Sequence, residues 1–344
     1  MSYNILITSI GGIRGRDLSL KLKESLKDTK IFTGDAIFQE NMEYFSDGFI
    51  LLKNTKNKKK YISHLLKVIK ENKIKLVIPG SDEEAILMSK FKREIKKKGT
   101  KVATDDYKIL KHFKDKYSTY EKLTKNGLYK IYWEKIKSFK ELKSKIDKIL
   151  LSIEEIVIKP VNSRGGRDVS IVTNSNIKTK YFNYKKEVLV SKKNFLKHYL
   201  HIYKDKFPLI LMERLQGVPL DVDVLSWNGN LIKCVVRKRI GYQGINGNII
   251  MKHNPKFINY IKKIVKCFNL SWIYDFDIML DKKNNPILIE LNPRISGSIS
   301  SSLCAGIPLF SDLLKLSKNK LTLIKNQKIK RNKIIKSFYC SISK

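Results

Sequence analysis

Residues 274–294 read YDFDIMLDKKNNPILIELNPR, and this stretch predicts a β-hairpin with polar side chains set into apolar strands. Strands are expected over residues 274–280 and 286–292, with the turn DKKNN between them. Residues two apart on a strand share a face, so Glu290 and Asn292 are expected on the same face. A carboxylate in an apolar run such as ILIEL is costly to bury unless it is paired or bound to a cation. The pattern therefore favours a functional site over a purely structural strand pair.

The same hairpin indicates the kind of ligand. Asp277 can project to the same place as Glu290 and Asn292, which brings together two carboxylates and an amide. This all-oxygen set suits Mg²⁺, a hard cation that keeps phosphate oxygens among its ligands, with Mn²⁺ as an alternative. Arg294 follows the second strand and is expected to hold a transferred phosphoryl group or an acyl phosphate. We therefore expect a metal and phosphate site on this hairpin.

A second segment, IVIKPVNSRGGRDVSIV at residues 156–172, has the composition of a phosphate-binding loop. An apolar strand delivers Lys159, and Gly165 and Gly166 follow in the loop before the next strand. Glycines let backbone N–H groups approach a phosphate closely, and Lys159 would add a positive charge. A plain hairpin turn explains the same residues equally well.

A third segment, ILMERLQGVPLDVDVL at residues 210–225, has features of an adenine site. Glu213 ends a strand and enters an irregular turn, where backbone groups and a carboxylate can meet the edge of the ring. An ordinary surface glutamate accounts for this residue equally well. Asp221 and Asp223 share one face of the next strand, and we expect this face to be salt-linked and non-catalytic.

Residues 1–105 predict a small α/β domain with a parallel sheet. A buried strand over 4–9 is followed by GGIRG and an amphipathic helix. A second cycle has a strand over 75–79 and a helix from about residue 83. GGIRG lacks both the spacing and the downstream acidic residue of a dinucleotide-binding motif, which argues against nicotinamide binding.

The composition limits the classes of partner. A net charge of +38 would suit nucleic acid, but only 10 of the 70 basic residues are Arg, which pairs bidentately with phosphate and base edges. A Lys-rich solvated surface is the simpler interpretation. The chain has no run of about 18 apolar residues and no signal-peptide pattern, and its four Cys are scattered. We therefore expect a cytoplasmic protein with reduced thiols that binds neither nucleic acid nor membrane.

The positions of the Arg residues carry more information than their number. Eight of the ten flank loops or strand ends around the segments described above, where each is a candidate anion contact. We regard Arg14 and Arg239, together with Ser296 in the stretch after the hairpin, as candidate substrate contacts. These positions suggest an anionic substrate such as a carboxylate.

The order of the motifs resembles the ATP-grasp superfamily over roughly residues 3–315. The motifs are DKY, IVIKP with its glycine pair, MERLQG, DFDIML and ILIELNPRISGS. The likeness is closest to carbamoyl-phosphate synthase-like members and related carboxylate–amine ligases. It implies an α/β fold in which a parallel-sheet domain precedes a two-part α+β ATP-grasp unit.

This resemblance and the expected elements together predict five segments. They are an N-terminal α/β domain (1–105), a helical connector (106–127), a lid (128–208), a C-terminal ATP-grasp part (209–327) and a Lys-rich tail (328–344).

The resemblance also implies roles for matching residues. The expected ATP contacts are Lys116, Lys159, Gly165, Gly166, Glu213, Leu215 and Asp221. The two lysines would contact phosphates, the glycines would lie in a lid loop, and Glu213 with the backbone near Leu215 would hold adenine. Many members carry an acidic residue for ribose where this chain has Gly217-Val-Pro-Leu220, so Asp221 is the candidate substitute. The implied metal ligands are Asp277, Glu290 and Asn292, and Arg294 would stabilise the acyl-phosphate step.

The reaction implied by the resemblance has two steps. ATP phosphorylates a small-molecule carboxylate, and an amine or similar nucleophile then displaces the phosphate. Because the chain has one ATP-grasp unit, the full carbamoyl-phosphate synthase reaction is not expected. Two alternatives stay open, a small-molecule kinase on the same scaffold and a basic nucleic-acid-binding protein. A homo-oligomer is also left open.

Overall fold

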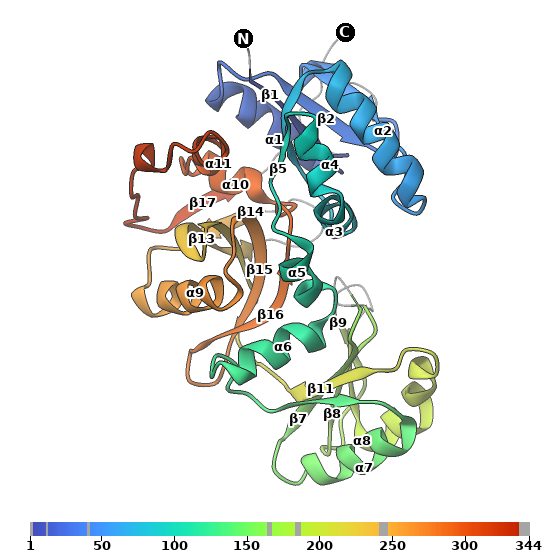
Figure 1. Cartoon of the computed structure of the whole chain (residues 1–344). Coiled ribbons are helices and arrows are strands. Elements are labelled where there is room, and N and C mark those ends of the chain that lie inside the picture. The colour runs from blue at the N-terminus through green and yellow to red at the C-terminus, as the bar shows by residue number, and fades with distance from the viewer. Residues whose placement is uncertain are drawn as a thin grey trace. The chain divides into compact units, whose positions relative to one another are not determined.

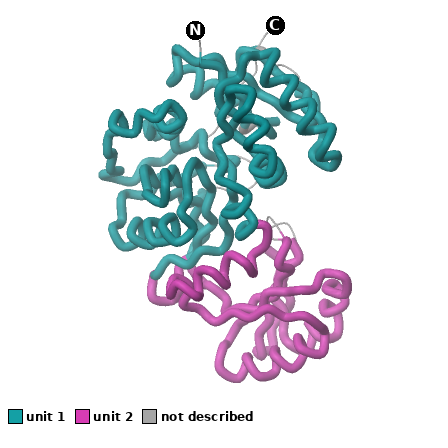
Figure 2. The backbone as a smooth tube through the Cα atoms, in the orientation of Figure 1, with its two compact units in different colours: residues 1–113, 218–279, 285–344 teal, residues 114–217, 280–284 magenta. Residues whose placement is uncertain are grey.

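The computed structural model describes residues 3–11, 13–39, 42–163, 167–182, 187–240 and 247–336, without the side chains of Ile13, Arg14 and Glu43. The chain divides into two compact units, which Figure 2 shows in different colours. Unit 1 comprises residues 1–113, 218–279 and 285–344, and unit 2 comprises residues 114–217 and 280–284. The unit boundary at residue 113 falls inside the segment 106–127 that was expected to be helical.

Unit 1 begins with a parallel sheet in the order β3-β2-β1-β4-β5, of which Figure 1 labels β1, β2 and β5. Its strands are β1 (Asn4–Thr8), β2 (Ile31–Asp35), β3 (Gly48–Leu51), β4 (Ile74–Ile78) and β5 (Lys101–Val102). Its helices are α1 (Ile13–Ser25), α2 (Lys58–Glu71), α3 (Asp82–Lys90) and α4 (Lys92–Lys97). The described strand pairs are all parallel, and the central strand β1 is buried along its length. The expectation of an N-terminal parallel sheet is confirmed.

The turn between β4 and α3 is tightly packed. A Cβ at Gly80 would lie 2.0 Å from the carbonyl oxygen of Thr8, so only glycine fits there. The Ser81 hydroxyl caps α3 by accepting a hydrogen bond from the backbone N–H of Glu84 at 3.3 Å. The Glu84 carboxylate in turn accepts hydrogen bonds from the Thr8 hydroxyl and from Tyr61. These contacts fix the first turn of α3, which carries Asp82.

The second sheet of unit 1 has the order β16-β15-β12-β13-β14-β17. Its strands are β12 (Leu220–Trp227), β13 (Asn230–Ile240), β14 (Gly247–Ile250), β15 (Trp272–Leu280), β16 (Pro286–Asn292) and β17 (Lys333–Lys336). The associated helices are α9 (Pro255–Phe268), α10 (Ile299–Cys304) and α11 (Leu309–Ser317). The predicted hairpin is therefore present as β15 and β16. Strand β17 lies in the tail, for which the sequence indicated no structure.

One apolar core joins the two sheets of unit 1. It contains Ile5 and Leu18 from the N-terminal part, together with Leu225, Trp272 and Phe310 from the second sheet and its helices. Burial of this many aliphatic and aromatic side chains is the main force that stabilises unit 1. Helix α9 buries one face against the sheet and ends at Asn269, whose φ of 53° is left-handed.

Unit 2 contains a sheet in the order β6-β11-β7-β8-β10-β9. Its strands are β6 (Trp133–Ile136), β7 (Glu155–Pro160), β8 (Val169–Thr173), β9 (Lys180–Phe182), β10 (Glu187–Ser191) and β11 (Leu209–Glu213). Its helices are α6 (Lys116–Lys125), α7 (Phe139–Ile149) and α8 (Lys192–Asn194). Its core packs α7 against the sheet through residues such as Leu142, Ile146 and Ile158.

The remaining elements are short. They are η1 (Met42–Tyr44), α5 (Tyr107–Leu110), η2 (Lys111–Phe113), the π-helical η3 (Phe195–Tyr199), η4 (Leu200–Tyr203) and η5 (Leu321–Leu323). Residues 192–203 form a succession of α, π and 3₁₀ turns. In the part of the chain that the structure describes, every helix is too short or too polar to cross a bilayer.

Candidate active site

The polar side chains of β15 and β16 meet in unit 1. The Asn292 amide nitrogen donates to Asp277 Oδ2 at 3.5 Å, so these two predicted ligands are neighbours. Glu290 is close enough for its charge to raise the pKa of Asp277. Because Asn292 uses its Nδ2 in this contact, its Oδ1 is the atom that can coordinate a cation. The structure thus places Asp277 beside Asn292, with Glu290 near enough to act on Asp277 through its charge.

Asp277 lies in strongly unfavourable surroundings for a negative charge. Burial raises its pKa well above the usual value, and the carboxylates of Asp275, Asp221 and Glu290 raise it further. Arg239 acts in the opposite direction. A cation bound here would relieve the repulsion between these carboxylates.

The donor set fits Mg²⁺ by its chemistry. Among the described residues, no group of three or more His, Cys, Asp or Glu is arranged to hold a metal ion, and the expected set has two carboxylates and the Asn292 amide. One oxygen of the neighbouring Asp275, Oδ1, is buried and accepts no hydrogen bond from the described residues. Arg237 Nη2 lies 4.0 Å from this oxygen. Oxygen donors crowded in this way suit a hard divalent cation better than a zinc ion.

Arg294 is held by two carboxylates before any ligand is present. Its Nη1 donates to Asp275 Oδ2 at 2.5 Å, and its Nε lies 3.7 Å from Asp82 Oδ1. Burial disfavours the charged guanidinium, but Asp275 and Asp82 outweigh this effect and raise the pKa of Arg294 above its ordinary value. Asp82 belongs to α3, so the N-terminal sheet domain supplies one side of this clamp. The arrangement holds a permanently charged group next to the predicted metal ligands.

The adjacent strands β12 and β13 carry a set of matched charges. The Asp223 carboxylate accepts from Arg237 Nη2 at 3.0 Å and from the Ser296 hydroxyl at 2.7 Å. Asp221 accepts a two-pronged contact from Arg239, Nε at 2.7 Å and Nη2 at 3.0 Å. The expectation that Asp221 and Asp223 form a salt-linked face is confirmed. Ser296, expected near the substrate, is buried in this network, whereas the Arg239 side chain is exposed.

The candidate phosphate contacts lie in unit 2. Lys159 on β7 is buried, and its Nζ donates to the Tyr120 hydroxyl at 3.2 Å. Lys116, the first residue of α6, is also buried, and its Nζ donates to the carbonyl oxygen of Ser163. Ser163 lies on the segment that leads into the predicted glycine loop. Both lysines are therefore buried within unit 2, and Lys116 contacts the segment that precedes the predicted glycine loop.

The candidate adenine contacts follow strand β11 in the same unit. Glu213 is the last residue of β11 and is partly exposed, while Leu215 is buried just after it. The Glu213 N–H donates to the carbonyl oxygen of Tyr132 at 3.0 Å. Gly165, Gly166 and the side chain of Arg14 lie outside the described residues.

Three contacts were missed by sequence reasoning. The clamp residues Asp82 and Asp275 were not proposed, although Asp275 shares a strand face with Asp277 by the period of two. Asp82 lies far from Arg294 in the sequence, and no local pattern predicts that pair. Tyr120 beside Lys159 was also missed, because a tyrosine on an amphipathic helix is indistinguishable from a core residue.

Comparison with known protein families gives two matches. Residues 205–338 match the family described as "ATP-grasp in the biosynthetic pathway with Ter operon", and residues 5–103 match the PylC-like N-terminal domain. No curated protein sequence matches the chain significantly.

Solved structures match the chain over most of its length at low sequence identity. Biotin carboxylase from Campylobacter jejuni in complex with β,γ-ATP has a TM-score of 0.69 and 17% identity, and the match covers 92% of this chain and 71% of that one. Phosphoribosylglycinamide synthetase from Anaerococcus prevotii has a TM-score of 0.66 and 14% identity, with 97% and 80% covered. L-amino acid ligase from Bacillus licheniformis has a TM-score of 0.65 and 13% identity, with 94% and 77% covered. Residues 205–338 thus resemble an ATP-grasp family, residues 5–103 resemble the PylC-like N-terminal domain, and the chain as a whole has the ATP-grasp fold.

Proposed function

We propose that this protein is an ATP- and Mg²⁺-dependent ligase that activates a small-molecule carboxylate as an acyl phosphate. An amine or similar nucleophile then displaces the phosphate, so that an amide-like bond forms and ADP and phosphate are released. The observation that supports the proposal is the hairpin of β15 and β16, where Asp277 contacts Asn292, is affected by the charge of Glu290 and lies near the clamped Arg294. The fold supports it, because the L-amino acid ligase and the synthetase named above share this fold.

The residues of unit 1 would serve the reacting phosphate. Asp277, Glu290 and Asn292 would hold Mg²⁺, which when bound offsets the charge of the ATP phosphates. Arg294 is held by Asp275 and Asp82, so little rotamer freedom is lost when its guanidinium meets a transferred phosphoryl group. The exposed guanidinium of Arg239, fixed through Asp221, is the candidate contact for an anionic substrate.

The residues of unit 2 would bind the nucleotide. Lys159 and Lys116 would contact ATP phosphates as point charges. Their burial favours this role, because a buried ammonium group is stabilised by an anionic ligand. Glu213 and the backbone near Leu215 would accept and donate hydrogen bonds at the adenine edge, with Gly165 and Gly166 in a loop over the phosphates.

ADP release against pooled carboxylic acids and amines tests this proposal. We expect substrate-dependent ADP release from the wild-type protein and none from Lys159→Ala or Glu290→Ala. Lys263→Ala, on the exposed face of α9, is the matched control and should keep the wild-type rate. Wild-type rates in both site variants would contradict the proposal.

The mass of the product separates a ligase from a kinase on the same scaffold. A ligase gives a condensed product only when the amine is present, together with free phosphate. A phosphorylated product that is stable and independent of the amine would instead indicate a kinase.

A further inference from the structure

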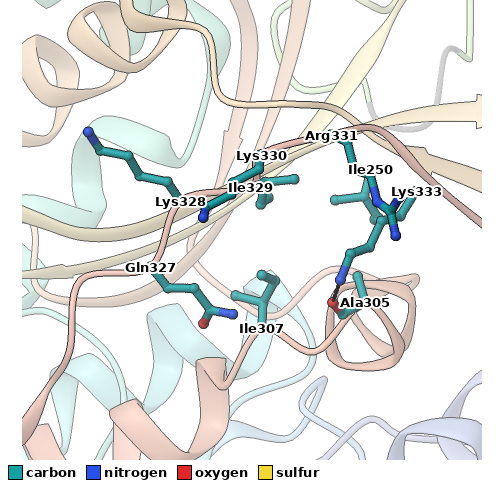
Figure 3. A pocket seen from close by; sticks show the side chains of 9 residues that line it. All are labelled: Ile250, Ala305, Ile307, Gln327, Lys328, Ile329, Lys330, Arg331 and Lys333. Atoms are coloured by element: carbon teal, nitrogen blue, oxygen red, sulfur yellow. Dashed lines mark hydrogen bonds between the residues drawn. The ribbon is translucent and has the colours of Figure 1, made fainter.

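Unit 1 contains a cavity of about 220 Å³ at the β14 side of its second sheet. Its walls come from Ile250 on β14, from Ala305 and Ile307 between α10 and α11, and from the segment 327–333 that leads into β17 (Figure 3). None of the residues proposed for the metal, ATP or substrate borders it. The cavity is therefore a separate feature of the described structure.

The floor of the cavity is apolar. Ile250, Ala305, Ile307 and Ile329 all border it, yet each of these side chains is buried. In Figure 3, Ile329 and Ile307 lie on opposite sides of the space. A ligand with an apolar body would bury its surface between them.

Hydrogen bonds fix the wall formed by segment 327–333. Just after the C-terminal end of α10, Lys333 Nζ donates to the carbonyl oxygen of Ala305 at 2.6 Å. Gln327 Nε2 donates to the carbonyl oxygen of Gly306 at 3.2 Å. The Ile329 carbonyl oxygen accepts from the His253 N–H at 2.9 Å. A cation and an amide that satisfy the last carbonyl groups of a helix stabilise its end. The cavity is thus preformed in this structure.

The charges around the cavity have one sign. Of its nine lining residues four are Lys or Arg and none is Asp or Glu, whereas the whole chain has 70 basic and 32 acidic residues in 344. Lys333 is engaged with Ala305, and Lys328 extends away from the cavity in Figure 3. This leaves Lys330 and Arg331 at the exposed rim, and neither forms an ion pair with another described residue. Each of these positive charges would attract an anion at the rim.

The volume limits the size of the occupant. It lies below the range of about 300–1,000 Å³ that is typical of cofactor and drug-sized sites, so a nucleotide does not fit. At the packing density of protein interiors the space holds roughly ten non-hydrogen atoms. That is the size of an aromatic or branched-chain carboxylic acid.

We propose that this cavity binds a small carboxylate with an apolar body, its carboxylate at the rim that carries Lys330 and Arg331 and its apolar part lying between Ile307 and Ile329. The proposal does not depend on the ligase function.

Fluorine NMR with 4-fluorobenzoate as the probe tests the proposal on the full chain. We expect saturable binding, much weaker binding of the neutral 4-fluorobenzamide, and no displacement of the probe by inorganic phosphate at the same concentration. The amide tests how much the negative charge contributes to binding, and phosphate tests whether charge alone is enough without an apolar body. Equal binding of acid and amide, or displacement by phosphate alone, would contradict the proposal.

Variants locate the probe. Lys330→Ala with Arg331→Ala should weaken binding about fivefold or more, since two exposed charge contacts are lost. Ala305→Leu should abolish it by filling the space. Lys262→Ala with Lys263→Ala removes the same charge from the exposed face of α9 and should leave binding unchanged. If the cavity variants fold and bind the probe like the wild type, the probe binds elsewhere and the proposal is wrong.

Discussion

Two neighbouring parts of one sheet use carboxylates in opposite ways. On β12 and β13 each aspartate faces an arginine, Asp223 with Arg237 and Asp221 with Arg239. On β15, Asp277 is affected by burial and by the charges of Asp275, Asp221 and Glu290, all of which raise its pKa. Charges that are matched within the protein stabilise it, whereas charges that are left in excess call for a ligand of the opposite sign. The contrast is the main reason to place the metal ion on β15 and β16.

The largest expected effect comes from removing the excess charge. Asp277→Asn should lower the rate of ADP release by about 10²–10³-fold, because a ligand of the cation is lost. The same change should leave the melting temperature unchanged or raise it, since it removes a buried like-charge repulsion. Steady-state ADP release and thermal unfolding measure the two effects. A fall in melting temperature with activity retained would show that Asp277 is structural.

Removing a charge that is paired within the protein, such as Arg237, should lower the stability instead. Arg237 is fully buried, so Arg237→Met leaves Asp223 buried without its cation and should cost about 3–5 kcal/mol of unfolding free energy. Chemical denaturation measures this loss, and adding Asp223→Asn should restore part of it. A loss below about 1 kcal/mol would contradict the claim that this pair is a structural element.

Asp105 offers a third case, a buried carboxylate held by neutral donors. The Tyr274 hydroxyl donates to it at 2.5 Å and the Ser271 N–H at 2.7 Å, while burial raises its pKa from 3.8 to about 6. The folded state therefore favours the protonated form, whose stabilising contribution is complete below pH 3.8 and is lost as the pH rises through about 6.

The stability of the wild type relative to Asp105→Asn should accordingly fall by about 1–3 kcal/mol between pH 4 and pH 7. Urea denaturation of both proteins at several pH values measures the difference. A difference that is constant over this range, or that grows with pH, would contradict the raised pKa of Asp105.

The smallest effect on the unfolding free energy is expected at Arg239, the exposed arginine of the two aspartate–arginine pairs. The Arg239 side chain is 71% exposed, so Arg239→Ala should change the unfolding free energy by less than about 1 kcal/mol despite the two-pronged contact with Asp221. The same denaturation assay measures it. A loss as large as that of Arg237→Met would mean that exposure does not distinguish the two pairs.

Much of the contrast between the strands β12 and β13 and the strands β15 and β16 could be predicted from local sequence patterns. The alternation of YDFDIML and PILIELN predicted both strands, which are present as β15 and β16. The salt-linked face of Asp221 and Asp223 was also predicted. Local patterns could not reveal Arg237 as the buried partner of Asp223, or Asp82 as a partner of Arg294, because these contacts depend on how distant segments pack.

The central claim is that Asp277, Glu290 and Asn292 hold a divalent cation together with ATP. Electron paramagnetic resonance of Mn²⁺, titrated with the protein in the presence of ATP, tests it most directly. We expect a protein-bound Mn²⁺–ATP signal in the wild type that is lost in the Asp277→Asn, Glu290→Gln double variant and kept in Arg239→Ala. An unchanged bound signal in the folded double variant would contradict the account.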